Sequence, residues 1–540
     1  MKRFLKYIIP SAAILLSAGM SSCTGDLDVT PISPKLVTEA NIDGLFNKCY
    51  ANLALAGNGD GGSGDGECDI AGYKDNGMTG LIRQMWNSNE LTTDEAICSW
   101  GDDGIPQFNF NTYDAAEPMA KAYFSRLTVG ISFCNQYLAI AADHNAKMTA
   151  EIRFVRALEY YLLMDAFGNV PFTEVVAKPV QYTRAQMYEW LEKELLAIEP
   201  DLSDAKAKTS ADAQYGHADK ACVWMLLSRL YLNAEVYTGT AQWAKAAEYA
   251  KKVMDAGYQL NTTGQNGWSA YQMLFMGDNG ESSAARECIF PIYQDSKTTA
   301  SYGSSTFLVA SCFSDNMHAN LKDPTGYNGT TEHWDGNRAR PDLVKKFFPM
   351  GNAPQVPSYE MVKEAGDDRA IFYGEDRTLE IDKYTEFKQG YGVAKFIAYK
   401  SDGSATFNTG FSDGDFFFFR LAEAYLTYAE ATARLNGNKT TKEGTDAVNA
   451  LRARAHTSTR TNDSYSLNDL LDEWSREFYF EGIRRPILIR FGKYGGNTDY
   501  IWSWKGGTKQ GRNFEAYKNV FAIPTDELTS NSNLKQNTGY

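Results

Sequence analysis

Residues 151–167 read EIRFVRALEYYLLMDAF, and this stretch decides the fold. Apolar side chains recur at helical spacing from Ile152 to Leu162, and Gly168 follows as a stop signal. The spacing predicts an amphipathic helix with a buried face.

Two further pairs of such stretches follow. Residues 218–234 (ADKACVWMLLSRLYLNA) and 242–256 (QWAKAAEYAKKVMDA) are separated by a short turn, and residues 419–435 and 443–455 by an Asn-Gly-Asn break. Helix pairs on a scale of about 34 residues with interleaved Ala and Tyr are typical of tetratricopeptide repeats. We therefore predict a mainly α fold built on a tetratricopeptide-like scaffold of helical pairs.

The segments outside these helices are rich in Gly, Asn, Asp, Ser and Thr with scattered aromatics. Strand-like stretches such as 288–293 and 306–310 are short, so little sheet is expected. Long irregular segments in a compact protein usually carry function. The prediction is a scaffold mainly within 117–256 and 416–490, supporting an irregular, loop-rich cap mainly within 57–115 and 260–415.

The N-terminus has the pattern of an exported chain. Basic Lys2 and Arg3 precede an apolar run over 7–16, which is about half the ~20 residues that a membrane-spanning helix needs. Ser21-Ser22-Cys23 then resembles the processing site of bacterial lipoproteins. We expect residues 1–22 to be a signal peptide, 23–540 the mature unit and Cys23 its lipidation site; the alternative is an ordinary signal peptide with an accidental cysteine.

Composition excludes several classes of function. The 540 residues include 53 basic and 67 acidic ones, a net charge of −14, which argues against a nucleic-acid partner. The chain has no H-E-x-x-H, G-x-S-x-G or Walker A sequence, and its eight cysteines form no C-x-x-C pair. Most cysteines are predicted to be core thiols, and no catalytic residues are assigned.

Aromatic residues in the loops provide the remaining chemistry. Trp100 lies in SWGDDG and Trp334 in TEHWDGN, among polar turn residues rather than apolar neighbours. An indole or phenol face can stack on the C–H face of a sugar, while Asp and Arg side chains bind its hydroxyls. Read with the 75–103 segment and Tyr302, this predicts a glycan site; the alternative is that both tryptophans only pin loops onto the body.

The whole pattern is familiar at this point. The N-terminal SSC and DLDVTP, followed by RALEYYLLMDAFGNVPF (156–172), FFRLAEAYLTYAEA (418–431) and WSREFYFEGIRR (474–485), resemble the SusD family of outer-membrane lipoproteins over essentially the whole mature chain. The resemblance implies a non-catalytic, cell-surface protein that binds starch or related α-glucan oligosaccharides. It also implies a SusC-like TonB-dependent transporter as partner and a lipid anchor in the outer membrane.

The resemblance also implies site residues. Stacking platforms fall on Trp100, Tyr302 and Trp334, and polar contacts on Asp75, Arg83 and Asp103. Asp103 stands where the family pattern leads us to expect an amide, and Cys98 where it leads us to expect a further aromatic. Other open alternatives are a different glycan, a protein-interaction scaffold without sugar binding, and a glycoside hydrolase.

A structural calcium site is implied in the same way. LFMGDN (274–279) and FSDGDFF (411–417) match its surroundings through Asp278, Asp413 and Asp415. Carboxylate oxygens at D-x-D spacing suit calcium. Without the resemblance, Asp413 and Asp415 are interpreted as turn residues that cap the next helix.

Overall fold

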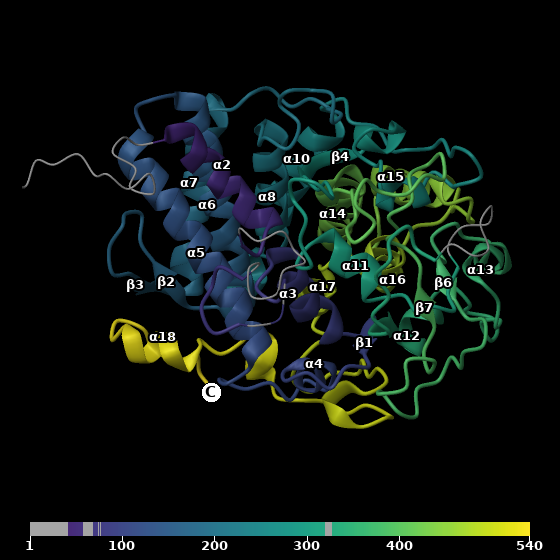
Figure 1. Cartoon of the computed structure of the whole chain (residues 1–540). Helices are drawn as coiled ribbons and strands as arrows, with labels where there is room; N and C mark the ends of the chain where they lie inside the picture. Colours follow the sequence, from purple (N-terminus) through teal and green to yellow (C-terminus); the bar gives the residue numbers. More distant parts are fainter. Residues whose placement is uncertain (1–40, 58–67, 74, 76, 319–326) are drawn as a thin grey trace, which may run out of the picture. The chain divides into compact units, whose positions relative to one another are not determined.

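The computed structural model describes residues 41–57, 68–73, 75, 77–318 and 327–540 (Figure 1). The chain divides into two units, Met1–Leu45 and Phe46–Tyr540, and the second contains everything discussed below. Helix α2 (Ile42–Ala54) crosses the division. The predicted signal peptide and Cys23 lie outside the described residues.

Helices in two separate parts of the sequence form one scaffold (Figure 1). Successive helices pack together: α5 on α6, α6 on α7, α8 on α10 and α14 on α15, while α10 also packs on α14 and joins the two parts. The predicted helical-pair scaffold is confirmed. Its helices are α5 (Pro118–Ala141), α6 (Ala146–Phe167), α7 (Arg184–Ile198), α8 (Lys220–Leu232), α9 (Ala234–Thr238), α10 (Trp243–Met254), α14 (Leu421–Leu435), α15 (Lys442–Arg454), α16 (Leu467–Phe478) and α17 (Arg484–Arg490).

Helix α6 shows how local sequence sets these elements. Its N-cap Asn145 accepts a hydrogen bond from the Met148 amide at 3.1 Å, and Gly168 ends it at a φ of 71°. The helix is buried on nearly all sides, not on one face as its periodicity predicts. Charged side chains are tolerated inside where they are paired: Arg156, for example, contacts Glu194 of α7 at 3.0 Å, and both side chains are buried.

The cap is irregular, as predicted. Within the described residues the strands of the whole structure form four two-stranded antiparallel pairs: β1 (Ala96–Cys98) with β5 (Asn337–Ala339), β2 (Val170–Phe172) with β3 (Val180–Tyr182), β4 (Cys288–Ile292) with β8 (Phe416–Arg420), and β6 (Phe372–Tyr373) with β7 (Gly392–Val393); the pair β2–β3 joins scaffold helices α6 and α7. The short helices outside the scaffold are α3 (Leu81–Trp86), α4 (Ile105–Asn109), α11 (Ser305–Ala310), α12 (Pro341–Val344), α13 (Ser358–Ala365) and α18 (Thr525–Ser530). Single π or 3-10 turns are η2 (Asn87–Leu91), η3 (Glu199–Asp201), η4 (Gln272–Phe275), η5 (Ser283–Arg286), η6 (Lys505–Gly507) and η7 (Ala516–Asn519).

Two local predictions are wrong. Residues 306–310 lie in helix α11 although their β-branched and aromatic side chains favour a strand; all of α11 is buried, and it packs on α3. Phe419 and Arg420 belong to strand β8, and helix α14 begins only at Leu421. Pairing with distant β4 overrides the helical pattern there.

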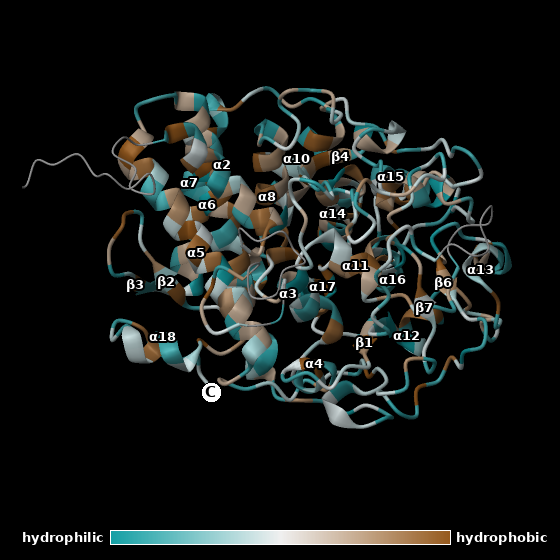
Figure 2. Ribbon diagram, in the orientation of Figure 1, coloured by the Kyte–Doolittle hydropathy of each residue, from teal (hydrophilic) through white to brown (hydrophobic). Residues whose placement is uncertain are grey.

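The buried residues agree with the predictions made for the helices, for Trp86 and for the cysteines. Figure 2 shows apolar and polar residues alternating along the scaffold helices. Trp86 is buried, as are six of the seven cysteines in the described part of the chain, and none of the seven is in a disulfide. Nowhere in the described ranges does a helix combine the length and apolar character needed to cross a membrane.

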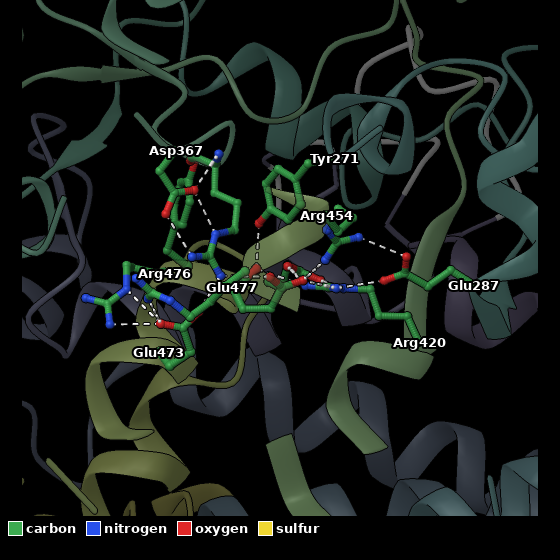
Figure 3. A network of polar contacts seen from close by, with 12 residues as sticks. Tyr271, Glu287, Asp367, Arg420, Arg454, Glu473, Arg476 and Glu477 are labelled. Atoms are coloured by element: carbon green, nitrogen blue, oxygen red, sulfur yellow. Dashed lines mark hydrogen bonds and ion pairs between the residues drawn. The ribbon is translucent and has the colours of Figure 1, made fainter. Parts of the chain in front are cut away.

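A buried network of charges, here called the ionic core, joins the cap to the scaffold (Figure 3). Arg420 of β8 contacts Glu477 and Glu481 at 2.7 Å each, and Arg454 of α15 contacts Glu287 at 2.9 Å. Burial would raise the pKa of Glu477, but Arg454 and Arg420 lower it to about 2. The main members of the ionic core are Glu287, Arg369, Arg420, Arg454, Glu473, Glu477 and Glu481.

Candidate functional site

The three predicted stacking residues, Trp100, Tyr302 and Trp334, lie together at the cap surface. The ring centroids of Trp100 and Trp334 are 6.4 Å apart with a 50° interplanar angle, and those of Tyr302 and Trp334 are 5.5 Å apart at 71°. All three side chains are half-buried. Each ring is tilted against the next rather than coplanar with it, and the three together are here called the aromatic arc.

Strand pairing brings the two tryptophans together. β1 and β5 are antiparallel, and beyond their ends the Ser99 amide donates to the Gly336 carbonyl at 3.0 Å. Trp100 then lies directly against Gly336, where a Cβ would stand 2.4 Å from the indole ring. Only glycine leaves room for the ring at this position.

Hydrogen bonds fix the two indoles. The Trp100 Nε1 donates to the Trp334 carbonyl, and the Trp334 Nε1 donates to Glu332 Oε2, both at 2.8 Å. Since each indole has one N–H, neither has a donor left for a ligand. The two rings can therefore offer a ligand only their faces and edges, which is the stacking role predicted from the sequence.

Tyr302 is supported from two sides. Its ring stacks on Phe411 at 4.8 Å with a 30° interplanar angle. Its main chain and Gly303 pack closely against Gly77 and Gly80, where a Cβ would lie within 2.3 Å of backbone atoms. Sequence reasoning missed Phe411, because it stands in the stretch that was read for calcium.

Arg83 and Asp75 lie beside the Tyr302 end of the aromatic arc. The Arg83 amide donates to the Gly303 carbonyl at 3.1 Å, and its Nη2 contacts Asp75 Oδ2 at 2.5 Å. The Arg83 side chain is 8% exposed and Asp75 is 56% exposed. A buried guanidinium thus orients a carboxylate that solvent or a ligand can reach.

Asp103 and Cys98 do not take part in the group formed by the three rings, Arg83 and Asp75. Asp103 is exposed on the loop after Trp100, and the contacts that join the rings with Arg83 do not include it. Burial raises the pKa of Glu117 to about 8, and nearby Asp103 adds to the shift. Cys98 is fully buried in β1, so it presents no surface to a sugar.

The acidic residues predicted to bind calcium come from two segments that lie in contact. The Asn279 side chain donates to the Asp415 carbonyl and accepts from the Asp415 amide, both at 2.9 Å. Each carboxylate is nevertheless engaged by protein donors: Asp278 by Ser401, Asp413 by the Ser296 amide, and Asp415 by the Gln294 amide and Tyr215. Within the described residues no group of three His, Cys, Asp or Glu side chains could hold a metal ion. As placed, the three do not fit a calcium cage, and the ion stays a prediction of the resemblance.

Comparisons with known proteins agree with one another. The SusD family model matches residues 320–540, and a model described as "Starch-binding associating with outer membrane" matches 36–232. The starch-binding protein SusD of Bacteroides thetaiotaomicron is 36% identical over an alignment that covers 100% of this chain and 99% of that protein.

Solved structures share the fold. A laminarin-binding SusD-like protein is 20% identical with a TM-score of 0.63, covering 93% of this chain and 99% of that one. Surface glycan-binding protein A from Bacteroides uniformis is 19% identical with a TM-score of 0.64, covering 92% and 98%. At these identities the likeness establishes the fold alone.

Proposed function

This chain belongs to the SusD family, and from that premise we propose that it is a non-catalytic cell-surface protein that binds starch or a related α-glucan. The observation that carries the proposal is the aromatic arc. Trp100, Trp334 and Tyr302 present tilted rings, and a tilted series matches a chain that curves better than a flat, extended one. Family membership supports glycan binding; the choice of α-glucan rests on this tilt of the rings and on the starch-binding relative.

The arc predicts weak binding. If one ring contributes roughly 1–3 kcal/mol, as stacking of a base on an aromatic does, three rings only partly offset the cost of ordering a flexible chain. We expect dissociation constants roughly in the millimolar to high micromolar range. Cyclic glucans should bind better than short linear ones because their curvature is already set.

Calorimetric titration of the protein with maltoheptaose, a cyclic α-glucan and a β-linked oligosaccharide of equal length tests the substrate. We expect the order cyclic, then linear α-glucan, then the β-linked chain. Preference for the β-linked chain would favour the second candidate, a SusD-like binder of a different glycan. Two departures favour that candidate: Asp103 stands where an amide is expected, and Cys98 where an aromatic is expected.

We also propose that Cys23 carries a lipid that holds the protein in the outer membrane, facing outward, and that a SusC-like TonB-dependent transporter receives the bound oligosaccharide. The N-terminal sequence supports the anchor, and the matched description "associating with outer membrane" supports the location. Cys23→Ala should release the protein from membranes. Gentle detergent extraction should recover the transporter with it, and repeated recovery of the protein alone would count against the partnership.

A further inference from the structure

A hollow of about 310 Å³ opens beside α15 and α16 and shares no residue with the aromatic arc. We call it the arginine hollow. Its lining includes four cationic and two anionic side chains, namely Lys346, Arg452, Arg460, Arg476, Asp367 and Asp469. In a chain with a net charge of −14, a concave surface with surplus positive charge is unusual, and it raises the local concentration of anions.

Pairing with the ionic core does not use up these charges. Glu473, which is 1% exposed, contacts Arg369 at 2.7 Å, Arg452 at 2.7 Å and Arg476 at 2.9 Å. Arg369 has further acidic partners, but Arg452 and Arg476 share this one carboxylate. One negative charge cannot balance both guanidiniums, so positive charge remains at the wall of the hollow.

Arg460 and Arg452 also keep N–H groups that can donate to a ligand. Both Nη atoms of Arg460 bond Asp469, at 3.1 and 2.8 Å, while its Nε has no hydrogen-bond partner in the described residues, and its side chain is 35% exposed. Arg452 donates through Nη1 to Glu473 and through Nη2 to Ser458 Oγ. Each of those nitrogens carries a second N–H.

From this geometry we propose that the arginine hollow binds a small oxyanion through Arg452, Arg460 and Arg476. Planar guanidinium groups match the paired oxygens of carboxylate and phosphate. The volume lies at the low end for small-molecule sites, so it suits an anion attached to a body no larger than one sugar ring. The two sources of this chemistry are free phosphate and the carboxylate of an acidic sugar.

Thermal melts of the protein at constant ionic strength, with phosphate, glucuronate or neutral glucose up to about 10 mM, distinguish the sources. We expect a saturable rise in melting temperature with at least one anion and none with glucose; the anion with the tighter apparent affinity identifies the source. Arg460→Gln should weaken that affinity by about threefold, the size of one partly exposed charge contact. Asp469→Asn should strengthen it, because it removes a competing carboxylate.

Arg153→Gln is the matched control, since Arg153 is 29% exposed and contacts Glu194 at 2.6 Å on the scaffold. It should leave anion affinity unchanged. The proposal is overturned if neither anion gives a saturable shift, or if Arg460→Gln and Arg153→Gln have equal effects. Weaker binding by Asp469→Asn would also overturn it, and this sign does not depend on how stable the Arg460 variant is.

Discussion

Charged side chains usually lie at the surface of a protein and aromatic ones inside it. The ionic core and the aromatic arc show the opposite arrangement. In the ionic core, Arg420 and Glu477 are fully buried, whereas the rings of Trp100 and Trp334 are half-exposed. One of the stretches that resemble the family, WSREFYFEGIRR, supplies Glu477 and Glu481 to the ionic core and none of the predicted sugar contacts. This family-like stretch therefore contributes to the stability of the fold, while the predicted sugar contacts lie in loops with little local pattern.

The physical consequence is that the two regions should fail in different ways. Removing one member of a buried charge network leaves its partners uncompensated in a low-dielectric interior. Removing an arc ring leaves a shallower surface that water fills. Changes in the ionic core should therefore affect folding, and changes in the arc should affect ligand binding.

Glu477→Gln is the largest expected effect. Arg420, Arg454 and Arg369 all contact Glu477, so the variant should lose about 3–5 kcal/mol of unfolding free energy. Urea denaturation measures the loss, and glycan affinity per folded molecule should not change. Asp446→Asn, which breaks an exposed pair with Lys442, is the control and should cost under about 0.5 kcal/mol. Similar losses in both variants would contradict the claim that burial makes the charges of the ionic core important for stability.

Gly336→Ala tests the arc without removing a ring. Its Cβ would lie 2.4 Å from the Trp100 indole, so the ring must leave its present position. We expect glycan affinity to fall by about tenfold, or 1.4 kcal/mol, in a calorimetric titration. Gly351→Ala is the control, because a Cβ there meets nothing within 4 Å. Unchanged affinity in Gly336→Ala would mean that the position of Trp100 does not matter for binding.

Glu117→Gln tests a smaller, pH-dependent effect at the N-cap of α5. The folded pKa of about 8 lies above the unfolded value of about 4.3, so the stabilisation from the protonated carboxyl is complete below about pH 4 and is lost progressively as pH rises to about 8. Melts at pH 4 should nearly coincide for the two proteins. At pH 9 the variant should melt about 1–2 °C higher, and a lower melting temperature there would contradict the assignment.

Calcium should have the smallest effect. Because Asp278, Asp413 and Asp415 already accept protein hydrogen bonds, an ion must displace those donors to bind. If the site that the resemblance implies does bind calcium, excess calcium should raise the melting temperature by about 1 °C over chelator and leave glycan affinity unchanged. Asp278→Asn should abolish the difference. Identical melts, with no metal by elemental analysis, would contradict the calcium site that the resemblance implies.

Periodicity was enough to predict the scaffold, because each helix carries its own apolar pattern. It misassigned 306–310 and Phe419–Arg420, where burial against α3 and pairing with β4 outweigh local preference. These partners lie more than 100 residues away along the chain, so a short stretch of sequence cannot reveal the contact.

The candidate site was predictable in part. Trp100 and Trp334 stood out by their polar neighbours, and the resemblance added Tyr302, Arg83 and Asp75. Phe411, Glu332 and Gly336 were missed because their supporting roles exist only once the loops are folded together.

The most direct test of the central claim is retardation of the Trp100→Ala, Trp334→Ala double variant in an amylopectin affinity gel, with a thermal melt of each protein. Trp224→Ala is the matched control, since Trp224 is half-buried on α8 and its indole bonds Glu199 at 2.7 Å, as Trp334 bonds Glu332. We predict that the double variant loses retardation while still melting as a folded protein, and that the control keeps both. Full retardation of the double variant would contradict the account, and a collapsed melt would show that the two tryptophans hold the loops in place.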